Sequence, residues 1–267
     1  MNKIGIIVGN GKLPLYFLEE AEAQNIEVYP IGLMDTIEEE IKEHKNFKKF
    51  NIGQIGSIIK YLLLRDIRKI VMLGKIEKDI IFKEMNLDYY GEELLKRLPD
   101  RKDETLLFGV ISFLRLNKIK VLPQNYLLKN FMFKESNYTL RKPDAEDMKT
   151  INMGIEAAKA LSKVDAGQTV VCKDMSVVAL EGIEGTDKTI IRAGELAGEN
   201  CIVVKMSRPQ QDMRVDIPAM GIETIKRAIE IKAKGVVAEA EKMLFLDSKE
   251  AIELANKNNI FIIGVKI

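Results

Sequence analysis

Acidic, basic and amide side chains gather between residues 181 and 221, among glycines and prolines. The carboxylates offer hard oxygen atoms, which are the ligands that Mg²⁺ and Mn²⁺ prefer. The cations of the same stretch offer the positive charge that a phosphate group needs. These residue types predict metal-assisted phosphoryl chemistry with Mg²⁺ or Mn²⁺ as the cofactor. The carboxylates are Glu181, Glu184, Asp187, Asp212 and Asp216, and the cations are Arg192, Lys205, Arg208 and Arg214.

The segment SRPQQDMRVDIPAMG carries the strongest of these signals. Pro209 and Pro218 interrupt it, which excludes a regular helix. Asp212, Arg214 and Asp216 stand at alternate positions, and this alternation predicts three charges on one side of a rigid loop that presents ligands. An ordinary solvated edge strand is the alternative interpretation.

A second cluster, EGIEGTD, follows a predicted strand and precedes a predicted helix. Gly182 and Gly185 permit unusual backbone angles, and either Thr186 or Asp187 is a candidate helix cap. Capping alone leaves the two glutamates of the motif unexplained. Because a helix N-terminus also favours anions, we expect the cluster to hold metal and phosphate together, with Glu184 and Asp187 as metal ligands.

A glycine turn, GNGKLP, follows the first predicted strand. Such a turn places backbone N–H groups and a helix N-terminus where open α/β sheets bind phosphates, so Gly9, Asn10 and Gly11 are candidate nucleotide contacts. Pro14 stands where the dinucleotide-binding pattern has its third glycine, and the Lys-Ser/Thr end of a P-loop is missing. A plain turn is an equal alternative, and Asp35 alone does not support NAD as a ligand.

The composition disfavours several other classes. The 41 Lys and Arg residues balance 40 Asp and Glu residues, so no global field draws nucleic acid. Cys172 and Cys201, the only cysteines, are expected to be buried in a protein of the reducing cytoplasm. His44 is the only histidine and is expected on the surface, which disfavours a histidine zinc site and a Ser-His-Asp triad. Neither a signal-peptide core nor an apolar run of about 20 residues is present.

Alternating strand-like and helix-like runs predict an α/β fold with two domains. Residues 1–132 are expected to form a Rossmann-like domain with a parallel sheet and helices on both faces. Residues 133–143 are polar and aperiodic and are expected to be a linker. Residues 144–267 are expected to form a second, distinct α/β domain, whose first helix is capped by Asp144. The predicted strands are 3–8, 26–31, 47–52, 69–73, 118–122, 169–172, 177–181, 201–205, 235–238 and 260–265.

Four segments occur in one order along the chain: IGIIVGNGKLP, VDAGQTVV, EGIEGTDKTIIRAGEL and VVKMSRPQQDMRVDIPAMG. Their combination resembles the UDP-2,3-diacylglucosamine pyrophosphatase family, in the two-domain form that is unrelated to the calcineurin-like phosphoesterases. The resemblance runs over nearly the whole chain and is strongest in its second half. It implies Mg²⁺-dependent hydrolysis of UDP-2,3-diacylglucosamine at the α-phosphorus, giving UMP and 2,3-diacylglucosamine 1-phosphate, in lipid A synthesis.

By this resemblance the essential acidic residue falls within QDMRVD, so Asp212 and Asp216 are the catalytic and metal-binding candidates. Arg214, which lies between them, is the third catalytic candidate. The chain has Arg208-Pro209 where the family usually has Lys-Pro, which keeps the charge but changes its geometry. The residues expected to bind the substrate are Gly9, Asn10, Gly11, Thr186, Lys205, Arg208 and Gln211.

The expected partner is the UDP-lipid substrate, together with peripheral contact with the inner membrane and a homodimer. Nucleic acid is not expected. Two alternatives are a nucleotide-dependent oxidoreductase based on the GNG turn and a non-catalytic UDP-lipid-binding protein. NAD binding without UDP-sugar hydrolysis would favour the first, and UDP-lipid binding without UMP release would favour the second.

Overall fold

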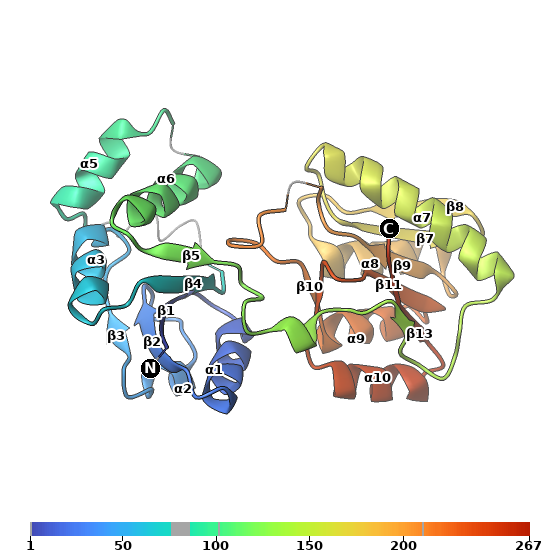
Figure 1. Ribbon diagram of the computed structural model, residues 1–267. Coiled ribbons are helices and arrows are strands. Elements are labelled where there is room, and N and C mark those ends of the chain that lie inside the picture. Colours follow the sequence, from blue (N-terminus) through green and yellow to red (C-terminus); the bar gives the residue numbers. More distant parts are fainter. Residues whose placement is uncertain (1, 76–85, 101, 210) are drawn as a thin grey trace. The chain divides into compact units, whose positions relative to one another are not determined.

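The computed structural model describes residues 2–75, 86–100, 102–209 and 211–267 (Figure 1). The chain forms two compact units, each with its own sheet. Met1–Leu128 and the short segment Met213–Val215 make up the first unit. Lys129–Asp212 and Asp216–Ile267 make up the second. An α/β fold in two units agrees with the fold class predicted from the sequence.

The first unit is built on five parallel strands in the order β3-β2-β1-β4-β5. The order reverses between β1 and β4, which is the point where open α/β sheets commonly bind ligands. The predicted parallel sheet is thereby confirmed. Its strands are β1 (Lys3–Val8), β2 (Glu27–Gly32), β3 (Lys48–Lys49), β4 (Lys69–Leu73) and β5 (Lys120–Leu122), and its helices are α1 (Leu13–Ala23), α2 (Glu39–Lys42), α3 (Ile55–Leu64), α5 (Tyr89–Arg97) and α6 (Asp103–Leu116).

One face of this sheet is covered by α3 and α6. Ile58 and Leu62 from α3 and Leu114 from α6 pack with Ile31 and Ile70 of the strands in one buried cluster. Branched side chains suit the pleated surface of a buried parallel strand, which explains the Ile- and Val-rich runs.

The second unit is built on a mixed sheet in the order β6-β13-β11-β9-β7-β8. β9, β11 and β13 are parallel, whereas β6, β7 and β8 each pair antiparallel. Two short parallel strands, β10 and β12, form a separate ribbon. The strands are β6 (Ser136–Asn137), β7 (Thr169–Lys173), β8 (Ser176–Leu180), β9 (Ile202–Lys205), β10 (Ala219–Met220), β11 (Gly235–Glu239), β12 (Leu244–Phe245) and β13 (Phe261–Val265).

Helices cover both faces of this sheet, with α7 on one face and α8, α9 and α10 on the other (Figure 1). The alternation of the strands explains the two layers, since neighbouring residues point to opposite faces. Val170 and Val204 pack in the cluster under α7, whereas Val171 and Val203 pack in the cluster under the other helices. The helices are α7 (Ala145–Lys163), α8 (Thr186–Ala197), α9 (Ile222–Glu230) and α10 (Ser248–Lys257).

The first helix of the second unit begins as the sequence predicts. Asp144 is its N-cap, and its side chain accepts a hydrogen bond from the Asp147 N–H at 2.8 Å. The Asp147 carboxylate in turn accepts from the Asp144 N–H at 3.1 Å, which completes a reciprocal capping box. Asp147 is almost fully buried and also pairs with Lys234 at 2.5 Å.

The segment 133–143, expected to be a linker, contributes structure to the second unit. Phe133 is fully buried against Phe245, with stacked rings 4.3 Å apart. Ser136–Asn137 forms β6 on the sheet edge, and the Thr139 hydroxyl accepts the Ile262 N–H at 2.9 Å. Polar residues therefore occur here because the segment lies at a sheet edge.

Other departures from the sequence expectations are local. The predicted strand 47–52 shortens to β3, and β6, β10 and β12 are not among the predicted strands. Cys172 and Cys201 are buried with free thiols, as expected. In the described ranges no helix combines the length and the apolar character needed to cross a bilayer.

Candidate active site

The candidate catalytic and binding residues of the second unit lie at one edge of its sheet. β8, β9 and β11 end at this edge, and β7 begins there, because Lys205 at the end of β9 pairs with both Thr169 and Ala238. α8, α9 and α10 follow these strands in the chain and therefore begin at the same edge. Helix N-termini present unsatisfied N–H groups and partial positive charge, so the edge suits anionic ligands.

Glu181, directly after β8, organises the start of the EGIEGTD cluster. Its two carboxylate oxygens accept hydrogen bonds from the Thr186 hydroxyl at 3.1 Å and from the Gln168 N–H at 3.0 Å. The Thr186 hydroxyl also lies 3.1 Å from the Thr169 hydroxyl. The hydroxyl of Thr186, which was expected to bind the substrate, is therefore part of a hydrogen-bond network with other residues of the protein.

Glu184 is also held by protein groups. Its carboxylate accepts from the Gly182 N–H at 3.1 Å, from the Thr189 hydroxyl at 3.3 Å and from Arg192 at 2.5 Å. The hydrogen bond from Arg192 is the main reason why the pKa of Glu184 lies below its ordinary value. The carboxylate thus closes the loop before α8, and its placement favours a structural role over the predicted role of metal ligand.

The cap of α8 differs from the expectation. Gly185 is the N-cap, with a φ of 81° that suits glycine, and a glycine offers no side chain to cap the helix. Thr186 and Asp187 are its first two helical residues, so neither is the predicted cap. Asp187 is exposed in the first turn, where a carboxylate interacts favourably with the helix dipole.

The loop after β9 is fastened at both ends by the sheet edge. Ser207, the second residue after β9, donates its N–H at 2.9 Å and its hydroxyl at 2.6 Å to one oxygen of Glu239. Beyond the loop, the Ala219 carbonyl accepts from the Lys205 ammonium at 3.1 Å. Lys205, expected to bind phosphate, therefore also supports the return of the chain.

Between these anchors the loop folds into turns. Asp216 donates its N–H to the Asp212 carbonyl at 3.1 Å, which closes one turn around Met213–Val215. Asp212, Arg214 and Asp216 therefore lie in a loop, as predicted, and not in the edge strand of the alternative interpretation. The Gln211 side-chain amide donates to the Asp216 carbonyl at 2.7 Å and to its carboxylate at 2.6 Å.

Gln211 and Arg208 have more specific environments than the sequence could show. The Gln211 side-chain oxygen accepts the Arg208 N–H at 3.2 Å, so the Gln211 side chain stabilises the loop by hydrogen bonds to other loop residues. Arg208 pairs with exposed Asp165 at 2.5 Å. Its Nε is buried without a hydrogen-bond partner among the described residues, and a buried donor in that state costs about 1–3 kcal/mol. Gln210, the neighbour of Gln211, lies outside the described residues.

Arg214 belongs to the first unit together with Met213 and Val215. Its guanidinium carbon lies 5.9 Å from the centre of the Phe108 ring, which is a cation–π distance. The Gln124 side chain donates to the Val215 carbonyl at 3.2 Å, and Val215 packs against the first hydrophobic core. Arg214 is thus grouped with a different unit from Asp212 and Asp216, and its catalytic role stays a prediction.

The glycine turn after β1 is fixed against the end of β4. Gly9 donates its N–H to the Leu73 carbonyl at 2.7 Å, and Asn10 donates to the Lys75 carbonyl at 2.8 Å. A Cβ on Gly9 would lie 2.5 Å from the Lys75 oxygen, so close backbone approach requires glycine here. Two of the N–H groups expected to bind phosphate are therefore already used. A Cβ on the third residue, Gly11, whose φ is 102°, would meet no atom of the described residues within 4 Å.

The described carboxylates of the second unit are not gathered into one metal-binding cluster. Within the ranges that the structure describes, no three Asp, Glu, His or Cys side chains are grouped as metal ligands. Glu184, Asp187, Asp212 and Asp216 are therefore not brought together as a single four-carboxylate ligand set. Mg²⁺ is commonly bound through one or two carboxylates with substrate phosphates, so Asp212 and Asp216 stay the predicted metal ligands.

His44 is half-buried and not on the open surface that the sequence suggested. Its Nδ1 accepts the Asn46 N–H at 3.2 Å, and burial lowers the pKa of the ring. The residue stabilises the turn after α2, which is a structural use of the imidazole.

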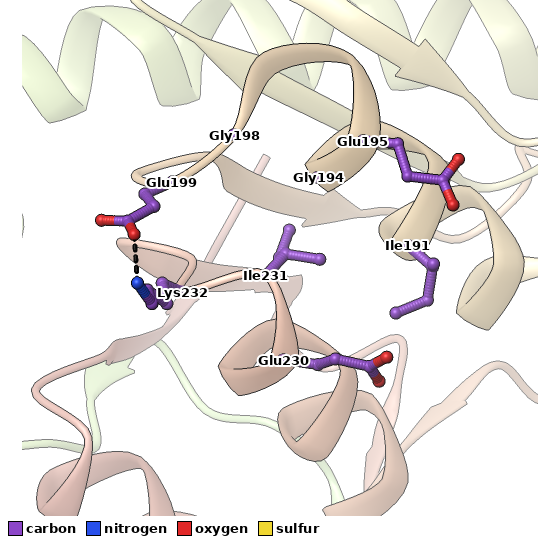
Figure 2. A pocket seen from close by; sticks show the side chains of 8 residues that line it. All are labelled: Ile191, Gly194, Glu195, Gly198, Glu199, Glu230, Ile231 and Lys232. Atoms are coloured by element: carbon purple, nitrogen blue, oxygen red, sulfur yellow. Dashed lines mark hydrogen bonds and ion pairs between the residues drawn. The ribbon is translucent and has the colours of Figure 1, made fainter.

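A surface pocket of about 400 Å³ lies between the C-terminal ends of α8 and α9 (Figure 2). Figure 2 shows Glu199 and Lys232 joined as an ion pair at its margin, and Ile231 beneath Gly194. These helix ends lead into the beginnings of β9 and β11, so the pocket lies at the opposite sheet edge from the loop of Asp212 and Asp216. Its position does not suit the predicted phosphoryl chemistry.

Sequence reasoning missed Glu239, Asp165 and Gln168 as parts of this edge. A usable signal existed for Glu239, since it ends the apolar run GVVAE in the same way that Glu181 follows VVAL. A carboxylate at the carboxyl end of a buried strand lies where α/β sheets place their sites. Asp165 and Gln168 lie in the segment VDAGQTVV that resembles the family, but no role was assigned to them, and their place at the edge follows from the antiparallel pairing of β7 and β9.

Comparison with known proteins covers both units. Residues 3–131 match the model of the LpxI N-terminal domain, and residues 134–263 match the model of the LpxI C-terminal domain. A relative from Caulobacter vibrioides, UDP-2,3-diacylglucosamine pyrophosphatase LpxI, is 25% identical over 277 residues, which span 99% of this chain and 98% of the relative. The order of the motifs, the two α/β units and the family models agree, and the chain belongs to the LpxI family.

Proposed function

We propose that this chain hydrolyses UDP-2,3-diacylglucosamine to UMP and 2,3-diacylglucosamine 1-phosphate, as a step of lipid A synthesis. The observation that carries the proposal is the loop of Asp212 and Asp216, which is anchored at the carboxyl edge of the second sheet. Motifs in this loop and in the EGIEGTD cluster are those that resemble the family, and the Caulobacter vibrioides relative bears the corresponding name.

Arg208 supports recognition of the diphosphate. Its buried Nε–H lacks an acceptor among the described residues, whereas its terminal nitrogen is held by Asp165. A phosphate oxygen would supply the missing acceptor through a charge-assisted hydrogen bond, which is stronger than a neutral one. The ion pair with Asp165 would fix the guanidinium plane in advance and reduce the entropy lost on binding.

Asp212 and Asp216 supply the acidic oxygens of the proposed reaction. When bound by these carboxylates and the diphosphate, Mg²⁺ would neutralise phosphate charge and make the α-phosphorus more electrophilic. A water oxygen forms the new bond to that phosphorus, and the bond from the phosphorus to the bridging oxygen breaks. One of the two carboxylates takes the proton of the water, and the bridging oxygen leaves with the sugar phosphate.

Gln211 and Glu184 receive different roles from those expected. The Gln211 side-chain NH₂ donates both of its hydrogen bonds to Asp216, and the side-chain oxygen accepts the Arg208 N–H. We therefore assign Gln211 to orienting the Asp216 carboxylate. The Glu184 carboxylate accepts hydrogen bonds from Arg192, Thr189 and Gly182, so we assign it to holding the loop before α8 in place.

The decisive experiment measures UMP release from UDP-2,3-diacylglucosamine with Mg²⁺ and with EDTA. We expect release that EDTA abolishes and Mg²⁺ restores. Asp212→Ala and Asp216→Ala should each cut turnover strongly while the circular-dichroism spectrum stays native. Near-normal turnover in both variants would contradict the site, and failure of the wild type to release UMP would contradict the function.

The oxidoreductase alternative has weaker support. Gly9 and Asn10 already donate their N–H groups to the end of β4, which removes two donors that a dinucleotide would use. A fluorescence titration with NAD provides the check, and we expect no saturable binding. UDP-lipid binding without UMP release under any divalent metal would favour a non-catalytic binding protein.

A further inference from the structure

We propose that Glu239 is a positioning residue for the reaction, because it fixes the start of the loop that carries Asp212 and Asp216. This inference rests on the proposed function, and it assigns a role to a residue outside both sequence motifs. Glu239 is the last residue of β11, and its effect on the reaction would pass through Ser207.

The anchor stands on a buried interior strand of the second unit. β11 lies inside the sheet between β9 and β13, and the residues before Glu239, Val237 and Ala238, are fully buried. A side chain projecting from the end of such a strand has little freedom to move with the loop. Glu239 is half-buried, which strengthens its hydrogen bonds relative to those of a solvated carboxylate.

Two donors of Ser207 converge on one oxygen of Glu239. The N–H lies 2.9 Å and the hydroxyl oxygen 2.6 Å from Oε2, so backbone and side chain of the same residue are held together. Hydrogen bonds to a charged acceptor are shorter and roughly twice as strong as neutral ones. Ser207 is thereby fixed in both position and orientation at the point where the chain leaves β9.

A continuous series of contacts leads from this anchor to the carboxylate. The residue after Ser207, Arg208, donates its N–H to the Gln211 side chain at 3.2 Å. The same side chain donates to the Asp216 carbonyl and carboxylate at 2.7 and 2.6 Å. Asp216 is exposed, so burial does not fix the position of its carboxylate. The hydrogen bonds from Gln211 restrain the carboxylate instead. Movement of Ser207 therefore displaces Arg208 and Asp216 together.

Steady-state kinetics of Glu239→Ala, Glu239→Gln and Ser207→Ala test the proposal. Loss of a group that orients a site residue typically lowers activity about 10- to 100-fold, and we expect that loss in kcat/KM for Glu239→Ala. Its kcat should fall because Asp216 moves, and its KM should rise because Arg208 moves. Glu239→Gln keeps one acceptor oxygen and should recover part of kcat. Ser207→Ala combined with Glu239→Ala should be no slower than Glu239→Ala alone, because the glutamate acts through the serine.

Glu241→Ala is the matched control. Glu241 lies two residues further along the same chain segment, is exposed, and pairs with Lys266 at 3.1 Å, away from the loop. We expect its kcat and KM to equal those of the wild type. Wild-type kcat in Glu239→Ala, or an equal loss in Glu241→Ala, would overturn the proposal.

Hydrogen exchange of the peptide covering residues 205–217 separates this proposal from the proposed function. We expect faster exchange of this peptide in Glu239→Ala and unchanged exchange in Glu241→Ala. If the wild type releases no UMP, the proposed function fails, and the exchange alone then decides whether Glu239 anchors the loop. Unchanged exchange in Glu239→Ala overturns the anchor. If that variant does not fold, Ser207→Ala, which removes the hydroxyl donor to Glu239, is read in its place, and unchanged exchange in Ser207→Ala overturns the anchor.

Discussion

Asp147→Ala should lower the free energy of unfolding of the second unit by about 2–4 kcal/mol. The Asp147 side chain is only 4% exposed, and it accepts hydrogen bonds from the Lys234 ammonium at 2.5 Å and the Asp144 N–H at 3.1 Å. Losing a capping group costs about 0.5–2 kcal/mol. Losing a hydrogen bond between charged groups costs about 1.5–3 kcal/mol, part of which Asp144 recovers because its carboxylate lies 3.7 Å from Lys234.

The pH dependence of this effect follows from Lys234. The hydrogen bond to Asp147 is the main cause that raises the pKa of Lys234 above its ordinary value of 10.5. A raised pKa contributes stability that is fully present below the unfolded value and disappears as the pH rises through the folded value. The difference between wild type and Asp147→Ala should therefore be complete at neutral pH and shrink in strongly alkaline solution.

Urea unfolding followed by circular dichroism measures the difference, with a fit that allows two transitions because the chain has two units. Glu146→Ala is the control, since Glu146 is exposed and its pair with Lys149 at 2.7 Å is worth less than about 1 kcal/mol. A double-mutant cycle with Lys234→Met should give a coupling of at least about 1 kcal/mol. A loss no larger than that of Glu146→Ala, or additive effects in the cycle, would refute the reasoning.

Three further outcomes follow from single environments in the second unit. The hydrogen bond from Arg192 lowers the pKa of Glu184, so this pair stabilises the fold above the ordinary value of 4.5. The free energy of unfolding, measured against pH, should exceed that of Glu184→Gln at neutral pH, and the difference should disappear as the pH falls below 4.5 and through the folded pKa. A difference that persists in strong acid would contradict the pairing. Gly194→Ala places a Cβ 2.3 Å from a methyl carbon of Ile231 and should cost about 1–3 kcal/mol in urea unfolding, so an unchanged midpoint would rule out the tight helix contact. Burial raises the pKa of the Cys172 thiol to about 12 and raises that of Cys201, so a thiol reagent should label both only after denaturation, and rapid labelling of the native protein would disprove their burial.

Local features of the fold were predictable from the chain alone. The period of apolar residues locates most helices and longer strands, and Asp144 marks the beginning of α7 because a cap acts on its own helix. The presence of only two isolated cysteines predicted that Cys172 and Cys201 are buried free thiols, and the structure confirms it. Short elements such as β6 and β12 escaped prediction, since two residues carry no measurable period.

The candidate site was predictable as a set of segments, but its geometry was not. Sequence patterns indicate that the loops around Glu184 and Asp212 carry charge and glycine or proline, because composition is local information. They cannot indicate that Glu184 is taken by Arg192, which depends on how the loop folds back onto α8.

What the sequence determined by itself is the order of strands and helices, the family and the chemical types available for catalysis. The tertiary structure decided which of those groups are already engaged in hydrogen bonds with other groups of the protein. Glu239 reaches Ser207 only because β11 and β9 are neighbours in register, and Gly9 loses its N–H to β4 for the same kind of reason. Pairing between distant strands is fixed by the packing of the whole sheet, so no single segment of the chain contains it.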